Sequence, residues 1–290
     1  MSFDDEEPIL RNIHVTPSYG QGQFTDFGWS GLFRSLSSHA LAALAEFHAE
    51  KDAHEKTFEK LRTGAAPRAG AGLGVVEPED EDPVAEDADD QPLSMAAFTE
   101  DWNESQFWFL DETAFALADQ LLDGASSSST IGVVSTPSVF IALKNRLNPE
   151  TDWDAQRFWP IQDRPKLVLF EHDHRFSVFP EFVFYDFQRP LQLPAHLKGS
   201  LDSVIIDPPF FSNDCQTKFA LTGRWLVKPK SPRVIVCTGE RMATIVDKLY
   251  RSLGVYATTF EPAHAGLSNH YYCYANFESS TWDWRSDESD

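Results

Sequence analysis

Hydrophobic positions after residue 98 fall into short runs of Val, Ile, Leu and Phe, separated by longer stretches with helical spacing. Short apolar runs bounded by turn residues are typical of buried strands. Helices between such strands predict a mostly parallel sheet that is covered on both faces. Seven strands are predicted, over 131–135, 166–171, 182–186, 203–207, 233–238, 255–261 and 270–277.

Apolar residues three and four positions apart predict helices between several of these runs. The predicted helices cover 112–122, 138–147, 216–226 and 240–253. Too few residues separate the last two strands for a helix, so we expect those two strands to pair antiparallel. The predicted fold class is therefore α/β, with a seven-stranded, mostly parallel sheet.

The pattern before residue 98 is different. A stretch rich in Ala, Leu, Glu and Lys follows two serines and predicts one helix. Next come Ala, Gly and Pro, and then nine acids between Glu77 and Asp90, a composition that buries too little apolar surface to offset chain entropy. The predicted parts are a flexible N-terminal extension (1–35), an N-terminal helix (36–62), an acidic linker or insertion (63–97), the main domain (98–280) and an acidic tail (281–290).

The charge of the chain limits its possible partners. Its 290 residues hold 45 acidic and 24 basic side chains, for a formal net charge of −21. Proteins bind nucleic acid by neutralising phosphates with Lys and Arg, so this balance argues against nucleic acid and favours a basic partner.

Cysteine content and hydropathy bear on the cellular setting. The three cysteines are odd in number and widely spaced, which predicts neither a metal cluster nor a disulfide framework. No apolar run reaches the length of a membrane span, and the acidic start lacks the basic region of a signal peptide. We expect a cytoplasmic monomer without membrane association or bound metal.

The segment Asp207-Pro208-Pro209-Phe210 directly follows an apolar run. Ligands of open α/β sheets bind at the carboxyl ends of strands. The two prolines remove donors and stiffen the backbone, which leaves the Asp207 carboxylate and the Pro208 carbonyl as acceptors. Together they could hold an NH2 group and turn its lone pair toward an electrophile, while Phe210 packs on the group that carries the amine. An ordinary strand-ending turn is the alternative interpretation.

A strand that ends in Asp/Asn-Pro-Pro-Tyr/Phe resembles the amino-methyltransferase signature of the class I, Rossmann-like methyltransferases. Further segments of the chain, in the same order, resemble the eukaryotic elongation factor 1-alpha lysine methyltransferase family, once described as N6-adenine methyltransferases. The resemblance covers residues 98–278 and the helix near residue 40. Its segments are SHALAAL (38–44), SQFWF (105–109), FEHDHRF (170–176), FVFYDF (182–187) and IDPPF (206–210).

The resemblance implies a Rossmann-like class I methyltransferase fold, S-adenosyl-L-methionine as the cofactor, and elongation factor 1-alpha as the protein substrate. It also implies a cofactor site at the strand ends. Glu171 would accept the ribose hydroxyls, and Asp173, two residues further on, is the less direct candidate. Asp186 would accept the adenine amino group, with Phe187 beside the ring. Acids at strand ends also commonly cap helices, which is the structural alternative.

Two further segments complete the implied site. The methionine end of the cofactor or the reacting amine would be covered by Ser105, Gln106, Phe107 and Trp108. The glycine-rich turn that usually follows the first strand is replaced by Ser135-Thr136-Pro137-Ser138. Ser, Thr and Pro can still present amides and hydroxyls at a helix N-terminus, so Ser135 and Thr136 are cofactor candidates.

Two other functions stay open. An N6-adenine methyltransferase acting on DNA or RNA could use the same motif, since an exocyclic amine suits Asp207 equally well. The missing glycine-rich turn raises a second alternative, in which the chain is a non-enzymatic binding module that kept the fold. Charge argues against the first, and the presence of Asp207 and Glu171 argues against the second.

Overall fold

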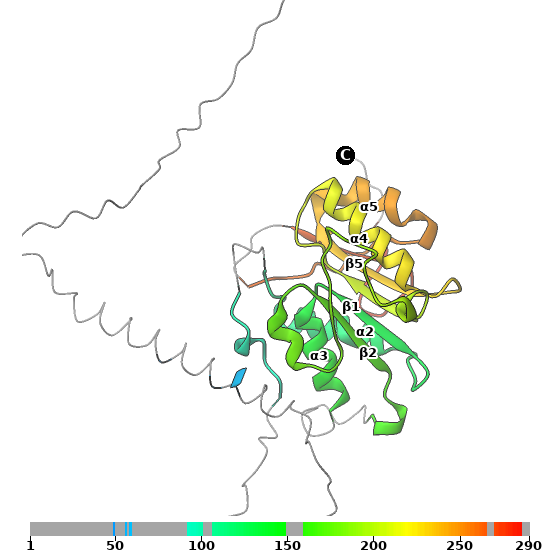
Figure 1. The fold of residues 1–290 in the computed structure, drawn as a ribbon. Coiled ribbons are helices and arrows are strands. Elements are labelled where there is room, and N and C mark those ends of the chain that lie inside the picture. The colour runs from blue at the N-terminus through cyan, green and yellow to red at the C-terminus, as the bar shows by residue number, and fades with distance from the viewer. Residues whose placement is uncertain are drawn as a thin grey trace, which may run out of the picture. The chain divides into compact units, whose positions relative to one another are not determined.

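The computed structural model describes residues 49, 56, 58–59, 92–100, 106–148, 159–265 and 270–285 (Figure 1). The expected N-terminal extension and most of the expected N-terminal helix and acidic linker lie outside the described residues. Within the range 36–62, the described residues Ala49, Lys56, Phe58 and Glu59 are helical.

Seven strands form one sheet in the order β3-β2-β1-β4-β5-β7-β6. Neighbours from β3 through β5 are parallel, whereas β7 is antiparallel to both β5 and β6. This arrangement confirms the predicted sheet and its antiparallel final pair. The strands are β1 (Thr130–Val134), β2 (Lys166–Glu171), β3 (Phe182–Phe184), β4 (Ser203–Ile206), β5 (Arg233–Gly239), β6 (Tyr256–Ala257) and β7 (Tyr271–Ala275).

The helices of the described regions follow the predicted ranges closely. The α-helices are α2 (Asp111–Leu122), α3 (Pro137–Leu147), α4 (Asn213–Leu226) and α5 (Ala243–Tyr250). Short 3-10 helices are η1 (Met95–Ala97), η3 (Ile161–Asp163), η4 (His174–Val178), η5 (Ala195–Leu197), η6 (Glu240–Met242) and η7 (Arg251–Leu253). The helix predicted over 240–253 is therefore α-helical only in its middle, because its two ends tighten into 3-10 turns. Among the residues described, none of the helices has the length and apolar character needed to span a bilayer.

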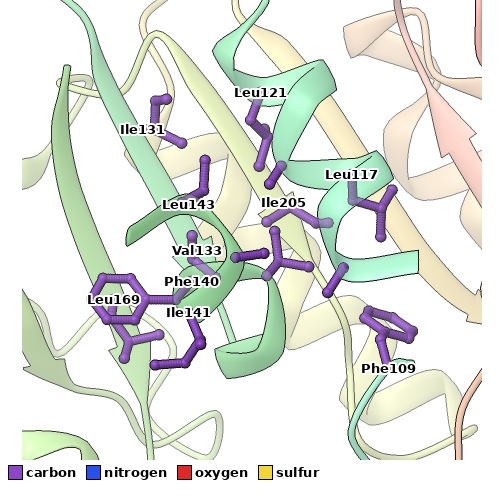
Figure 2. Close-up of a cluster of buried hydrophobic side chains, with 14 of the residues drawn as sticks. Phe109, Leu117, Leu121, Ile131, Val133, Phe140, Ile141, Leu143, Leu169 and Ile205 are labelled. Atoms are coloured by element: carbon purple, nitrogen blue, oxygen red, sulfur yellow. The ribbon is translucent and has the colours of Figure 1, made fainter. Parts of the chain in front are cut away.

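Alternating side chains of the strands supply two cores, one on each face of the sheet. Val133 of β1 belongs to a buried cluster with Leu117 of α2 and Phe140 of α3 (Figure 2). The next residue, Val134, belongs to a second cluster with Phe219 of α4. Helices thus cover both faces, as the apolar runs predicted (Figure 1).

The packed chain extends beyond both ends of the range 98–280. Asn145 of α3 fixes the backbone of Leu93, accepting its N–H at 2.9 Å and donating to its carbonyl at 2.8 Å. Near the other end, Trp282 is buried in the core. Of the predicted strand 255–261 only β6 is a strand in the structure, and the next residue, Thr258, makes an isolated bridge to Trp284.

Candidate active site

Strands β1 and β4 are neighbours at the centre of the sheet, where the strand order reverses direction. Open α/β sheets bind ligands at this switch point, beyond the carboxyl ends of the strands. The Asp207 N–H donates to the Val134 carbonyl at 3.1 Å, which ties the chain after β4 to the end of β1. A cavity of about 350 Å³ lies at this edge.

Most of the predicted site residues meet in this cavity. Ser105 lies outside the described residues, while Thr136, Asp173 and Pro208 are not part of the lining. The predicted residues that line the cavity are Gln106, Phe107, Trp108, Ser135, Glu171, Asp186, Phe187, Asp207, Pro209 and Phe210.

Asp207 is half-buried, and its Oδ1 atom is enclosed without a hydrogen-bond partner among the described residues. Burial raises the pKa of this carboxyl well above its usual range, and the nearby Glu171 carboxylate raises it further. Buried acceptors are nearly always satisfied in folded proteins, so a lone one in a cavity suits a ligand that brings a donor.

The loop after Asp207 is fixed from the α4 side. Gln216 is fully buried, and its Nε2 donates to the Phe210 carbonyl at 3.3 Å and to Thr238 Oγ1 at 3.0 Å. The Ser212 side chain caps α4 by accepting the Cys215 N–H at 3.2 Å. Phe210 keeps 40% of its surface exposed, so an aromatic ring stands at the cavity beside the carboxylate.

Glu171 ends β2 and is buried, with 6% of its surface exposed. Its Oε1 accepts the backbone N–H groups of His172 at 2.8 Å and Asp173 at 3.1 Å. Burial raises the pKa of Glu171 to about 7, against the lowering effect of these two hydrogen bonds. Within the described chain no donor reaches the other oxygen, Oε2, which is therefore available to hydroxyl groups of a ligand.

Asp186 and Phe187 follow β3 at the same edge. Asp186 Oδ1 accepts the Gln188 N–H at 2.8 Å. The Phe187 ring centroid lies 5.7 Å from that of Phe210 and 6.0 Å from that of Phe219. This aromatic wall offers a flat surface to a planar ligand group.

Asp173 faces a polar network instead of the cavity. Its Oδ2 accepts from Arg175 Nε at 2.8 Å and from Gln106 Nε2 at 3.1 Å, and Arg175 also donates to Gln106 Oε1 at 3.1 Å. Burial raises the pKa of Asp173, but the hydrogen bonds and charge of Arg175 outweigh burial and leave it lowered. Asp173 thus orients Gln106, and its direct contact with a cofactor stays a prediction.

Trp108 is held by both its ring and its backbone. The indole Nε1 donates to the Phe98 carbonyl at 2.8 Å, and the backbone N–H donates to Glu100 Oε1 at 2.9 Å. These two hydrogen bonds fix Trp108 in the lining of the cavity.

The turn after β1 takes a backbone conformation that usually belongs to glycine. Ser135 has a φ of 53°, and its N–H donates to the Phe170 carbonyl at 2.9 Å. Thr136 is buried, and its Oγ1 donates to the Val134 carbonyl at 2.9 Å. Ser135 lines the cavity, while the hydroxyl of Thr136 is used within the turn.

Sequence reasoning missed several residues of the lining, above all His264 and Tyr271. The His264 ring centroid lies 4.4 Å from Phe109 and 4.2 Å from Tyr271. Burial lowers the pKa of His264 to about 4. Burial raises the pKa of Tyr271, as does the charge of Asp207. Tyr271 falls within the apolar run 270–277, which predicts a strand and gives no sign of a cavity residue. His264 lies in a segment whose hydrophobic positions follow neither helical nor strand spacing.

A family model described as "Probable N6-adenine methyltransferase" matches residues 100–279. The chain is 37% identical to Protein-lysine N-methyltransferase EFM5 of Saccharomyces cerevisiae, over 87% of this chain and 95% of that protein. It is 34% identical to EEF1A lysine methyltransferase 1 of Gallus gallus, over 84% of this chain and 94% of that protein. Its identity to the Homo sapiens protein of the same name is 31%, over 84% of this chain and 92% of that protein.

Proposed function

The chain belongs to the EEF1A lysine methyltransferase 1 family, and we propose on that basis that it transfers methyl groups from S-adenosyl-L-methionine to a lysine nitrogen of elongation factor 1-alpha. One observation carries the proposal at the level of chemistry. Asp207 Oδ1 is an enclosed acceptor without a partner in the described regions, and Asp207 lines a cavity of ligand size. A substrate amine brings the donor that this oxygen needs.

The cavity suits the cofactor in charge and shape. S-adenosyl-L-methionine supplies an electrophilic methyl group on a positively charged sulfur. Glu171, Asp186 and Asp207 are the acids of the lining, and the described lining includes neither Lys nor Arg. Glu171 Oε2 would accept the ribose hydroxyls, Asp186 the adenine amino group, and Phe187 would pack against the adenine ring.

The residues around Asp207 can prepare a lysine for attack. A free lysine has a pKa near 10.4 and must lose a proton before its nitrogen becomes a nucleophile. Asp207 would accept an N–H of the ammonium and orient it, while the aromatic surroundings disfavour its charge and lower its pKa. The proton leaves to water. The nitrogen lone pair would then be free to accept the methyl group that the bound cofactor would supply, with the S–C bonding pair left on sulfur.

The family model's description keeps N6-adenine methylation as the second candidate. An adenine amino group could also meet Asp207. Nucleic acid, however, must bring phosphates to a chain of net charge −21, toward a cavity whose charged lining is acidic. A positively charged lysine is instead attracted to an acidic chain, and lysine is therefore the favoured substrate.

Methyl transfer to purified substrates tests the proposal. Labelled S-adenosyl-L-methionine is offered with elongation factor 1-alpha, and separately with adenine-containing DNA and RNA. We compare the wild type with Asp207→Asn and with Asp247→Asn, a control carboxylate on α5 that pairs with Arg251 at the surface. Label in the protein that disappears only in Asp207→Asn supports the proposal. Label only in nucleic acid would support N6-adenine methylation instead. Label in neither would contradict the proposal that elongation factor 1-alpha is the substrate.

We further propose that the enzyme is a cytoplasmic monomer that needs no metal. Cell fractionation and light scattering of the purified protein check the first two of these predictions, and activity in the presence of a chelator checks the third.

A further inference from the structure

His264 and Tyr271 form one wall of the cavity, apart from the acids that suit the cofactor and from the loop that carries Asp207. We propose that this wall, named here the acceptor wall, holds the target lysine side chain while its ammonium loses a proton. The inference rests on the proposed function and assigns the place within the cavity where the lysine is bound.

The strand order places the acceptor wall on the side of Asp207 away from the cofactor acids. Asp186 follows β3, Glu171 ends β2, Asp207 follows β4, and Tyr271 begins β7. In the sheet order β3-β2-β1-β4-β5-β7, these residues succeed one another from one side of the cavity to the other. With adjacent strands about 4.8 Å apart, β7 lies about 10 Å beyond β4. Asp207 therefore separates a cofactor side from an acceptor side.

The antiparallel pairing of β7 brings Tyr271 to this edge. Tyr271 pairs with Gly239, the last residue of β5, so the start of β7 lies at the carboxyl end of the parallel strands. The Phe211 ring packs against Tyr271 at 5.4 Å, and Arg241 lies 4.7 Å above the Phe211 ring. Packing therefore fixes the Tyr271 ring.

His264 completes a rigid surface. Its ring lies between those of Phe109 and Tyr271, and only 9% of its surface is exposed. The backbone around it is also tied down, because Leu110 donates to the Ala263 carbonyl at 2.9 Å. A lysine side chain next to this surface loses hydration on that side.

The acceptor wall is uncharged at neutral pH. The low pKa of His264 keeps its imidazole neutral, and the raised pKa of Tyr271 keeps its phenol protonated. Other titratable groups that act on Tyr271 are Asp207, the protonated thiol of Cys237 on β5 and Arg241 of η6. Asp207 thus offers its unpartnered Oδ1 as an acceptor to the ammonium, while the neutral wall removes water and disfavours the charge.

The pH dependence of turnover tests the acceptor wall directly. Tyr271→Ala lets water reach the lysine, so its pKa in the complex rises. At saturating cofactor we expect kcat at pH 7.5 to fall about tenfold and the acid limb of the kcat profile to move up by about one pH unit. Cofactor affinity, measured by calorimetry, stays within about twofold of the wild type, because the cofactor side is untouched.

Two further variants keep the test decisive. Tyr272→Ala is the matched control, since this neighbour points away from the cavity, where its hydroxyl donates to Glu240 Oε1 at 2.8 Å. His264→Gln changes the side-chain volume less and should move the acid limb of the kcat profile in the same direction. It replaces Tyr271→Ala as the test if that variant does not fold. An unchanged acid limb in both wall variants overturns the inference, as does a loss of kcat that follows a loss of cofactor binding. Wild-type enzyme that leaves elongation factor 1-alpha unlabelled overturns the proposed function instead, and the inference with it.

Discussion

Ser135 donates its backbone N–H to the Phe170 carbonyl at 2.9 Å while its own backbone has a φ of 53°. The first hydrogen bond ties the turn after β1 to β2, and the positive φ lets the chain enter α3. Left-handed backbone is costly for residues with a Cβ and most costly for β-branched ones. The turn thus keeps the shape that glycine usually provides, with serine in its place.

Ser135→Val should weaken cofactor binding more than Ser135→Gly does. Valine at this φ costs about 1–3 kcal/mol, which the turn can avoid only by moving away from the cavity. Glycine adopts the same backbone without strain and loses only the hydroxyl. Calorimetry with the cofactor should therefore give a loss of at least tenfold for valine and a smaller loss for glycine. Equal losses would mean that the hydroxyl, and not the backbone shape, supports binding.

The strands next to the cavity could be predicted from sequence because each is a continuous apolar run that ends in a polar or turn residue. β2 has the predicted bounds, β1 is displaced by one residue at both ends, and β4 ends one residue earlier than predicted. β6 could not be bounded in this way, because its length depends on its pairing with β7, in which only Tyr256 and Ala257 take part.

The same distinction holds for the site. Glu171, Asp186 and Asp207 could be predicted, since parallel strands bring their carboxyl ends to one edge. Tyr271 could not, because its place depends on the register of β7 against β5, in which it pairs with Gly239. His264 could not be predicted either, because it is held at the cavity by ring packing with Phe109, and no sequence pattern indicates such a contact.

Cofactor affinity should fall as the pH drops below about 7. Glu171 must be ionised to accept two hydroxyl hydrogens, and its pKa is about 7 because it is buried. Binding stabilises the ionised form, so it releases a proton, and affinity decreases by up to about tenfold per pH unit on the acid side. Calorimetry at pH 6 and pH 8, in two buffers of different ionisation enthalpy, measures both effects. Glu171→Gln should bind weakly at both values, with a flatter dependence on pH.

Asp207→Asn should abolish turnover and raise thermal stability at pH 8. The folded-state pKa of Asp207 lies above its unfolded value, so the folded chain retains this proton while the unfolded chain releases it. The free energy of unfolding therefore decreases as pH rises between the two pKa values. Asparagine has no charge to bury and escapes this loss. The melting temperature of the variant should exceed that of the wild type by a few degrees at pH 8, and the difference should shrink at pH 4. A variant that is less stable at both pH values would show that Asp207 has a stabilising partner.

Arg175→Gln should weaken cofactor binding without touching the cavity. Arg175 connects Asp173 to Gln106, which lines the cavity, and donates to the Thr99 carbonyl at 3.0 Å, so it holds Gln106 in place. Half-exposed ion pairs contribute about 1 kcal/mol or less, and we expect a loss in affinity of about threefold to tenfold. Arg251→Gln removes an exposed pair with Asp247 and is the control. Equal affinities of the two variants would exclude a role for the network.

Gln216→Leu should reduce turnover more than it reduces cofactor binding. The Gln216 amide group holds both the Phe210 carbonyl and Thr238 Oγ1, and thereby fixes the loop that carries Asp207 relative to β5. Leucine keeps the volume but leaves both groups without their donor, and misplacement of the loop affects the reacting amine first. We expect kcat to fall about tenfold, with cofactor affinity within about twofold of the wild type. Gln120→Leu on α2, whose amide donates to Thr281 at the surface, provides the same chemical change elsewhere. A parallel loss of cofactor affinity in Gln216→Leu would assign the residue to the stability of the whole cavity and not to the position of Asp207.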